Sequence, residues 1–437
     1  YTPLALKQTE EVNSILSATR KFYNKSGMLF LALTLVLIGV YPFFISGQLE
    51  NSLVRWMILV LAGSTLVDYF FLGKYRVLLT ANQEGYVVAL IQAAGTIVNM
   101  VVSIFLIYIG AGVLFVKAVA TGVYMLRLVL VKIYAKRKYP ALDFHAEPNE
   151  GALKQKNAAL LHQVVGIIVN NTDTTVLTIC LGAKSLLEVS VYGIYMMVVN
   201  AVNQLMTSFS NGLTAGFGEV IAKNEEETLK KSYSSYEYMY FVIMFIVIAC
   251  MGVLILPFVG VYTINLTDVQ YVRPVLGILF TLIVFMQNVR IPGLTIICAA
   301  GHYKETRYQA ILEAVINITV SLGLVWKFGM AGVLLGTVCS YGYRSFEIVF
   351  YTSRHLVKGC AKKSMFRILR NVFTVAILCT VGTYVIPQEI TSFTTWFLYA
   401  IGMGLTSVFL VVVINYVVEP DEFMQLRHRV NDIIKKE

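Results

Sequence analysis

The sequence predicts an all-α, polytopic membrane protein with about twelve transmembrane helices. Of its 437 residues, 57% are hydrophobic and only 14% are charged, and the mean hydropathy is +0.71. Soluble domains carry about 25% charged residues. A helix needs about 20 apolar residues to cross a bilayer, so a dozen spans use most of the chain. Little room is left for a soluble catalytic domain.

Twelve apolar runs follow one another along the chain, separated by short connectors. They lie near 27–46, 54–73, 87–109, 112–134, 158–182, 189–215, 239–260, 272–300, 308–326, 329–351, 366–386 and 394–417. An open strand leaves backbone groups unpaired in lipid, and the alternating pattern of a membrane barrel is absent. Each run is therefore expected to form a helix.

Lysine and arginine divide unevenly between the two sets of connectors. Of the lysines and arginines outside the apolar runs, almost all lie in the connectors on one side and at the two termini. The connectors on the other side contain Lys184 and Lys327. Basic residues mark the cytoplasmic side of a membrane protein. Both termini of this chain are therefore expected in the cytoplasm.

The sequence contains no recognisable catalytic or metal-binding motif. The six cysteines include no CxxC pair, and five of them lie in apolar runs, where they are expected to act as small core residues. The five histidines are scattered, and no HExxH, GxSxG or glycine-rich phosphate loop is present. We expect no catalytic residue, no metal site and no cofactor.

An internal repeat relates the two halves of the chain. In each half a Gly-Val-Leu stretch is followed ten residues later by a glycine, and an asparagine lies in the preceding run: Gly112, Gly122 and Asn99, then Gly332, Gly342 and Asn317. The glycines are 220 residues apart (332 − 112 and 342 − 122), and the asparagines are 218 apart. Such a repeat predicts two lobes of similar topology.

The repeat also predicts the domain boundaries. They are an incomplete N-terminal lobe at 1–135, a cytoplasmic linker at 136–157, a C-terminal lobe at 158–352, two runs at 366–417 that lie beyond the repeat, and a cytoplasmic tail at 418–437. The same offset places the start of the first lobe before Tyr1. Two further helices are therefore expected, which would give fourteen in the full protein.

Several stretches resemble the Wzx-type polysaccharide flippases, within the multidrug/oligosaccharidyl-lipid/polysaccharide exporter superfamily. The resemblance runs over the whole chain. It lies in Tyr1-Thr-Pro-Leu-Ala, Asn171-Thr-Asp-Thr-Thr, Val191-Tyr-Gly-Ile-Tyr, Ala299-Ala-Gly-His-Tyr-Lys-Glu-Thr-Arg, Glu313-Ala-Val-Ile-Asn-Ile and Gly332-Val-Leu-Leu-Gly-Thr.

The resemblance implies two helical lobes around a central cavity, with an extra helix pair at the C-terminus. It implies transport of an undecaprenyl-pyrophosphate-linked oligosaccharide across the bacterial plasma membrane by alternating access. The implied partners are that substrate, membrane lipids and other polysaccharide assembly proteins, without nucleic acid. The alternatives are a multidrug or cation exporter of the same superfamily and a polytopic polysaccharide-biosynthesis enzyme.

Cations at membrane depth are costly, so they are candidate ligands of an anionic lipid headgroup. Arg290 is the first candidate, because a guanidinium binds phosphate oxygens bidentately. A carboxylate on a neighbouring helix could equally neutralise it. Arg344, Arg127 and Lys117 are further candidates, and their alternative role is anchoring, with the side chain reaching the headgroup zone.

A second set of candidates combines carboxylates and amides. Asp173 lies beside Asn170 and Asn171 in a polar stretch that must face a cavity or another helix, as an ion-coupling or substrate site or as a packing network. Glu313 shares a helical face with Asn317, and Asp68 could pair with a cation of an adjoining helix. Glu347, three residues after Arg344, is expected to pair with it.

Two surface features are also predicted. The tyrosines of 233–240, with Tyr192 and Trp326, lie near span ends, where aromatic belts are usual. The segments 10–23 and 420–435 are amphipathic and basic, and they are expected to lie on the membrane surface.

Overall fold

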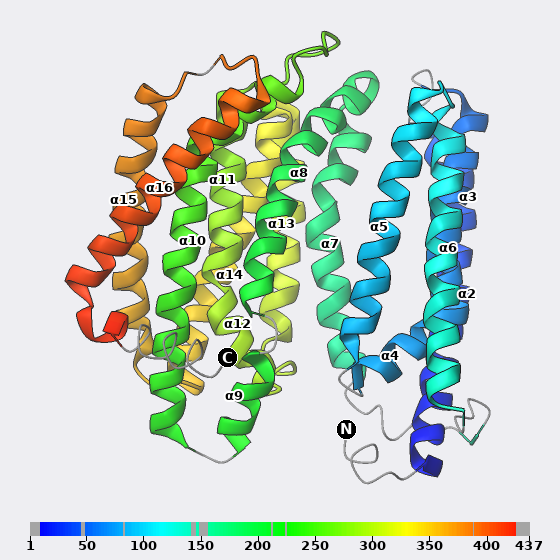
Figure 1. Ribbon diagram of the computed structural model, residues 1–437, viewed down its shortest axis with the longest axis horizontal. Coiled ribbons are helices and arrows are strands. Elements are labelled where there is room, and N and C mark those ends of the chain that lie inside the picture. Colours follow the sequence, from blue (N-terminus) through cyan, green and yellow to red (C-terminus); the bar gives the residue numbers. More distant parts are fainter. Residues whose placement is uncertain are drawn as a thin grey trace. The chain divides into compact units, whose positions relative to one another are not determined.

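The computed structural model describes residues 9–44, 49–81, 84–140, 146–147, 156–210, 213–222, 225–387 and 389–424. The long elements in these ranges are all helices, and none of the described residues lies in a strand (Figure 1). The all-helical class predicted from the sequence is therefore confirmed. The chain forms two compact units, unit 1 (Tyr1–Lys156) and unit 2 (Asn157–Glu437).

Unit 1 is a group of long helices with one short helix at the end where α5 begins. Its elements are α2 (Thr9–Phe44), α3 (Asn51–Val67), the π-helical turn η1 (Asp68–Leu72), α4 (Gly73–Ala81), α5 (Gly85–Tyr108) and α6 (Val113–Lys138). Helices α5 and α6 form a hairpin and α3 packs on α6. Figure 1 shows α4 lying across that end of the unit.

Unit 2 is built around the long helix α10. Its elements are α7 (Lys156–Cys180), the 3-10 turn η3 (Gly182–Lys184), α8 (Ser185–Ser210), α9 (Leu213–Ala222), α10 (Glu226–Tyr262), α11 (Pro274–Val289), α12 (Ile291–Ala299), α13 (Arg307–Phe328), α14 (Met330–His355), α15 (Cys360–Val385) and α16 (Phe393–Val418). Helix α10 packs against α11, α15 and α16.

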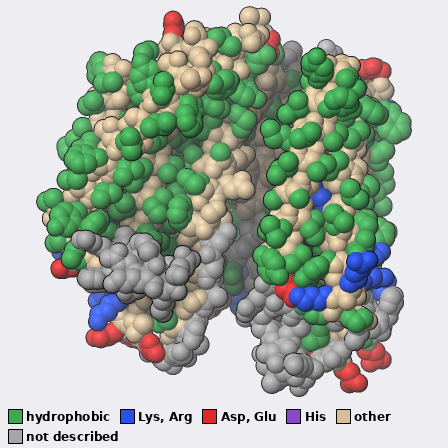
Figure 2. Space-filling view, viewed as in Figure 1, with side chains coloured by type: hydrophobic (Ala, Val, Ile, Leu, Met, Phe, Trp, Pro, Cys, Tyr) green, Lys and Arg blue, Asp and Glu red, His purple; other side chains and the backbone are tan. Residues whose placement is uncertain are grey.

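Ten helical segments among the described residues are long and apolar enough to cross a membrane. Apolar side chains such as Leu29, Phe373 and Phe409 are 63%, 70% and 66% exposed, and Figure 2 shows hydrophobic side chains along the helices with charges gathered at their ends. The protein is therefore a multi-pass membrane protein. Helices α7 and α14 are not among the ten. The described apolar part of α7 is shorter, at 164–180, and α14 carries several charged residues.

The segment 10–23 does not form a separate surface helix. It is the first part of the continuous helix α2, and its Val12 and Leu16 are buried in a cluster with Tyr75 of α4 and Val131 of α6. The amphipathic pattern therefore reflects packing against these helices, which corrects the surface-lying prediction. Most of the segment 420–435 lies outside the described residues.

The predicted aromatic belt is also wrong for most of the tyrosines in α10. Tyr233, Tyr236, Tyr238 and Tyr240 are each at most 5% exposed and belong to the interior of unit 2. Three of their hydroxyl groups find buried hydrogen-bond partners there, which makes this burial affordable. Trp326, at 76% exposed, keeps the outward position that a belt residue needs.

Helices α13 and α14 form the closest helix pair of unit 2. They are joined at Gly329, whose φ of 57° favours glycine. A Cβ on Gly332 would lie 2.4 Å from the carbonyl oxygen of Leu324, and one on Gly336 would lie 2.7 Å from the backbone nitrogen of Ser321. Glycine at these positions lets the two backbones touch.

Candidate functional site

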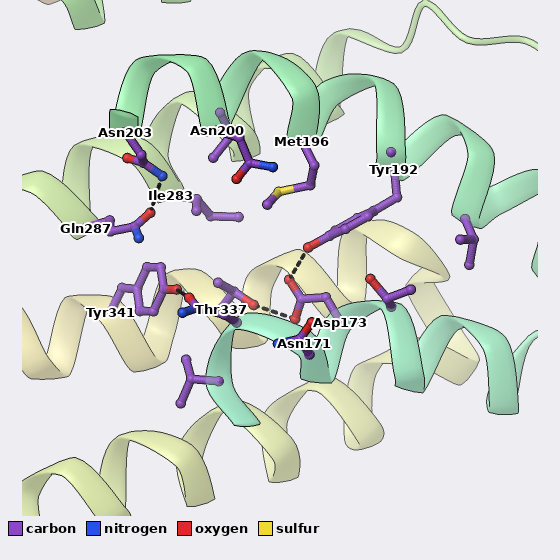
Figure 3. A pocket seen from close by; sticks show the side chains of 16 residues that line it. Asn171, Asp173, Tyr192, Met196, Asn200, Asn203, Ile283, Gln287, Thr337 and Tyr341 are labelled. Carbon is purple, nitrogen blue, oxygen red and sulfur yellow. Dashed lines mark hydrogen bonds between the residues drawn. The ribbon is translucent and has the colours of Figure 1, made fainter. Parts of the chain in front are cut away.

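A polar cavity of about 620 Å³ lies inside unit 2. Four helices line it, and the lining contains five carboxamides, two tyrosines and a single ionisable acid (Figure 3). The lining residues are Val169, Asn170, Asn171, Asp173, Thr174, Val189, Tyr192, Gly193, Met196, Val199, Asn200, Asn203, Ile283, Gln287, Thr337 and Tyr341. The polar stretch of α7 therefore faces a cavity, and not lipid.

Asp173 is held by hydroxyl groups from two other helices. Its side chain is 3% exposed. Thr337 of α14 donates a hydrogen bond of 2.7 Å to Oδ1, and the hydroxyl of Tyr192 on α8 donates one of 3.4 Å to Oδ2. Among the described residues no cation pairs with this carboxylate, and its charge is stabilised by these hydroxyl groups and by the nearby side-chain amide of Asn317.

Asn317 of α13 extends this network and has a vacant acceptor. Its side chain is fully buried, and its amide nitrogen donates to the Oγ1 of Thr337 at 3.0 Å. Its Oδ1 accepts no hydrogen bond from any described residue. A buried acceptor without a donor is uncommon in folded proteins. Asp173, Thr337 and Asn317 together offer oxygen atoms that suit a small, hard cation with a single positive charge.

Clusters of three or more His, Cys, Asp or Glu side chains suited to a metal ion are not found in the described ranges. An ion at Asp173 would instead be held by one carboxylate and neutral oxygens.

The carboxamides of the cavity form hydrogen bonds with one another and with tyrosines. Tyr341 donates to the Oδ1 of Asn170 at 2.9 Å, and Asn203 donates to the Oε1 of Gln287 at 2.9 Å. Asn171 donates to the carbonyl oxygen of Ile167 at 2.8 Å. The chain of amides continues behind the cavity, because Asn288 donates to Asn203 and accepts from Tyr240.

Asn200 differs from the other amides of the cavity. Its side chain points into the space between α8 and the helices opposite (Figure 3). It has no hydrogen bond to another described residue. A carboxamide offers two donors and one acceptor, so Asn200 is available to a polar ligand.

The two candidate arginines of unit 2 are paired with carboxylates. Arg290 lies between α11 and α12, forms an ion pair with Glu313 and lies over the ring of Tyr341, 4.5 Å from its centroid. Arg344 forms an ion pair with Glu347, as expected, and its Nε lies 3.6 Å from Glu313. An incoming anion would have to compete with these glutamates.

The burial of Arg344 favours a role inside unit 2 over the anchoring alternative. Its side chain is only 4% exposed, whereas a cation that reaches the headgroup zone must be hydrated there. Asn317, one turn from Glu313 on α13, belongs to a different polar group around Thr337. The polar face of α13 therefore serves two neighbouring networks.

The candidate residues of unit 1 are Asp68, Lys117 and Arg127, of which Asp68 and Arg127 both lie near Tyr124. Asp68 in η1 pairs with Arg76 of α4. Lys117 is exposed. Arg127 lies at 5.8 Å from the ring centroid of Tyr124, and within the described ranges its guanidinium has neither an ion pair nor a hydrogen bond.

Several cavity residues were not predicted from the sequence. They are Tyr192, Asn200, Asn203, Gln287, Thr337 and Tyr341. A usable signal existed for some of them, since Asn200 and Asn203 are polar residues three positions apart in an apolar run, a spacing that puts both on one helical face. The hydroxyl groups gave no such signal, because Thr and Tyr are common in spans.

The chain shares its fold with a flippase of known structure. It is similar to a structure described as "Lipid II flippase MurJ, inward closed conformation", with a TM-score of 0.65, 16% sequence identity, and coverage of 95% of this chain and 86% of the other. No protein-family model and no curated protein matches the chain. At this identity the likeness establishes a MurJ-like polytopic helical fold.

Proposed function

We propose that this protein is a membrane transporter that moves a lipid-linked oligosaccharide across the bacterial plasma membrane by alternating access, with both termini in the cytoplasm. The fold likeness to a lipid II flippase supports a lipid-linked substrate. The single observation that carries the proposal is the amide-lined cavity inside unit 2.

The chemistry of this cavity suits sugar hydroxyl groups. Its volume of about 620 Å³ is typical of a site for a small organic molecule. Carboxamides both donate and accept hydrogen bonds, as hydroxyl groups do, and the rings of Tyr192 and Tyr341 offer apolar surface beside them. Asn170, Asn171 and Asn200 would contact the saccharide in this proposal.

Asp173 is proposed as the coupling-ion site. The vacant Oδ1 of Asn317 and the uncompensated carboxylate would both be satisfied by one cation. The site involves α7, α8, α13 and α14, so an ion bound there would alter the packing of the helices that line the cavity. Glu313 belongs to the adjoining network and would position Arg290 and Arg344.

A multidrug or cation exporter is the second candidate function. One observation favours it, because the lining of the cavity contains a carboxylate, Asp173, and no lysine or arginine. A cationic drug would pair with Asp173, whereas a neutral glycan would contact the amides. An enzyme is less well supported, because Asp173 is the single carboxylate of the cavity lining, which contains no histidine, cysteine or lysine.

A genetic test separates the two transport functions. The full-length gene is expressed in a bacterial strain lacking it, and surface polysaccharide is scored together with undecaprenyl-linked oligosaccharide in the inner leaflet. Restored polymer with the intermediate cleared supports the proposal. Continued accumulation with normal membrane insertion, together with extrusion of a cationic dye, supports the exporter.

Variants then locate the site within the same assay. Asn200→Leu and Asp173→Asn are expected to abolish complementation at unchanged protein level. Phe373→Leu, at a position 70% exposed on α15, is the control and should transport normally. If Asn200→Leu also transports normally, the cavity does not bind the substrate.

A further inference from the structure

Arg127 differs from the other candidate arginines because no described carboxylate pairs with it. Arg290 and Arg344 both form ion pairs. In the described part of unit 1, Arg127 has only the ring of Tyr124, and its buried Nε has no hydrogen-bond partner. A cation within a membrane helix is costly unless an anion neutralises it.

The carboxylates of unit 1 are used elsewhere. Asp68, which like Arg127 lies near Tyr124, pairs with Arg76. Glu84 pairs with Lys138 at 2.6 Å. The other described carboxylates of unit 1 lie at or beyond helix ends: Glu10, Glu11, Glu50 and Glu147. An anion for Arg127 would therefore come from outside the described part of this unit.

The side chain of Arg127 runs sideways across the neighbouring helix. A Cβ on Gly95 of α5 would lie 2.2 Å from its Nε and 2.6 Å from its Cδ and Cγ. Gly95 and Arg127 are equally far from Ala111 in the connection between α5 and α6 (111 − 95 = 127 − 111 = 16). They therefore lie at the same height. A snorkelling side chain would instead run along the helix towards its end.

The internal repeat allows the positions around Arg127 to be compared with the equivalent positions in unit 2, where arginines and glutamates form ion pairs. By the repeat offsets of 218 and 220 residues, Gly95 is the equivalent of Glu313 (95 + 218), and Arg127 is the equivalent of Glu347 (127 + 220). In unit 2 both positions carry carboxylates, and these pair with Arg290 and Arg344. In unit 1 one carboxylate position is a glycine and the other is a cation.

We propose that Arg127, laid across α5 by Gly95, binds the phosphate oxyanion of a lipid headgroup, and that Gly95 is its positioning residue. A guanidinium presents a planar set of donors that matches phosphate oxygens. The oxyanion can come from a prenyl diphosphate or from an anionic phospholipid. The first source rests on the proposed function, whereas oxyanion binding itself does not.

Binding is measured with the full-length protein in phosphatidylcholine nanodiscs. The two probes are undecaprenyl diphosphate and phosphatidylglycerol, and bound lipid is counted by native mass spectrometry. Arg127→Gln is expected to weaken prenyl diphosphate binding roughly ten- to hundredfold, the value of charged hydrogen bonds. Gly95→Ala keeps the arginine but displaces it, and should weaken binding about tenfold or more. The affinity of Arg127→Lys for prenyl diphosphate should lie between those of the wild type and Arg127→Gln.

Gly122→Ala is the matched control for Gly95→Ala. Gly122 lies on α6 itself, and a Cβ there would meet no atom within 4 Å, so binding and melting temperature should stay unchanged. If Gly95→Ala lowers the melting temperature, the double variant Gly95→Ala with Arg127→Ala shows whether the loss of stability comes from the clash between the added Cβ and Arg127. Arg127→Ala removes the three atoms that lie nearest to the added Cβ, so the second substitution should restore stability but not binding.

The outcomes separate the site from its ligand. Loss of prenyl diphosphate binding in both Arg127→Gln and Gly95→Ala, at unchanged melting temperature, supports the inference in full. Loss of phosphatidylglycerol binding alone supports the oxyanion site and contradicts the prenyl diphosphate source, and with it that part of the proposed function. Wild-type binding of both probes by Arg127→Gln overturns the inference.

Discussion

Replacing Arg367 should destabilise the attachment of the C-terminal helix pair. Arg367 of α15 is 1% exposed and is the largest fully buried side chain in the described protein. It forms ion pairs with Glu237 of α10 at 3.0 Å and with Glu419, just beyond α16, at 2.7 Å. One guanidinium thus joins three segments of unit 2. The perturbation is Arg367→Met, which keeps the bulk and removes the charge.

The magnitude follows from what the substitution leaves behind. Glu237, 3% exposed, would keep only the hydroxyl donors of Tyr233 and Ser364, at 3.1 and 2.6 Å. Breaking a buried ion pair by removing one partner costs about 3–5 kcal/mol. Glu419 would lose less, because Arg370 also binds it, at 2.9 Å.

The assay is the thermal unfolding of the purified protein in detergent. The control is Lys358→Met, since Lys358 and its partner Glu226 are 76% and 80% exposed and such surface pairs contribute about 0–1 kcal/mol. Arg367→Met should lower the melting temperature by several times the control's shift. Adding Glu237→Gln should recover much of the loss, because no buried charge then stays unpaired. Equal shifts for Arg367→Met and the control would refute this reasoning.

Three further predictions concern other parts of the protein. Gly336→Ala should cost about 1–3 kcal/mol by forcing α13 from α14, whereas Gly342→Ala, in open space, should not; equal unfolding temperatures would contradict the close packing. Burial acts to raise the pKa of Glu422, but hydrogen bonds from Lys363 and Ser234 outweigh it and hold that pKa below 4.5. Its stabilisation should therefore be present at neutral pH and disappear as the pH falls below about 4.5, so the melting temperatures of wild type and Glu422→Gln should converge there. Arg290→Gln should stop transport; if adding Glu313→Gln restores it, Arg290 is structural and does not bind the substrate.

The fold class could be predicted from sequence because lipid imposes a local requirement. Each apolar run must satisfy its own backbone groups, so composition within about 20 residues identifies a membrane helix. Helix ends were less predictable. The start of α2 carries both basic and apolar residues, and sequence alone did not distinguish packing on α4 and α6 from packing on a membrane surface.

The candidate site was only partly predictable, because its contacts join distant residues. Asp173 stood out as an acid in an apolar run, but its partner Thr337 is 164 residues away and ordinary in a span. Arg290 and Glu313 were each noticed, yet only the structure brings them together. Arg367 lies at the start of an apolar run, where a cation usually meets the headgroups, and nothing local indicates its burial.

The one-residue connection between α13 and α14 has a mechanical consequence. Because Gly329 is the whole connection, one helix can move along its axis independently of the other by no more than about 1.5 Å, the rise of one residue. A larger axial shift must move both helices. Thr337, Tyr341 and Arg344 lie on successive turns of α14 and contact, in that order, Asp173 and Asn170 of α7 and Glu313 of α13. An axial displacement of α14 at any one of these contacts would therefore displace the other two as well.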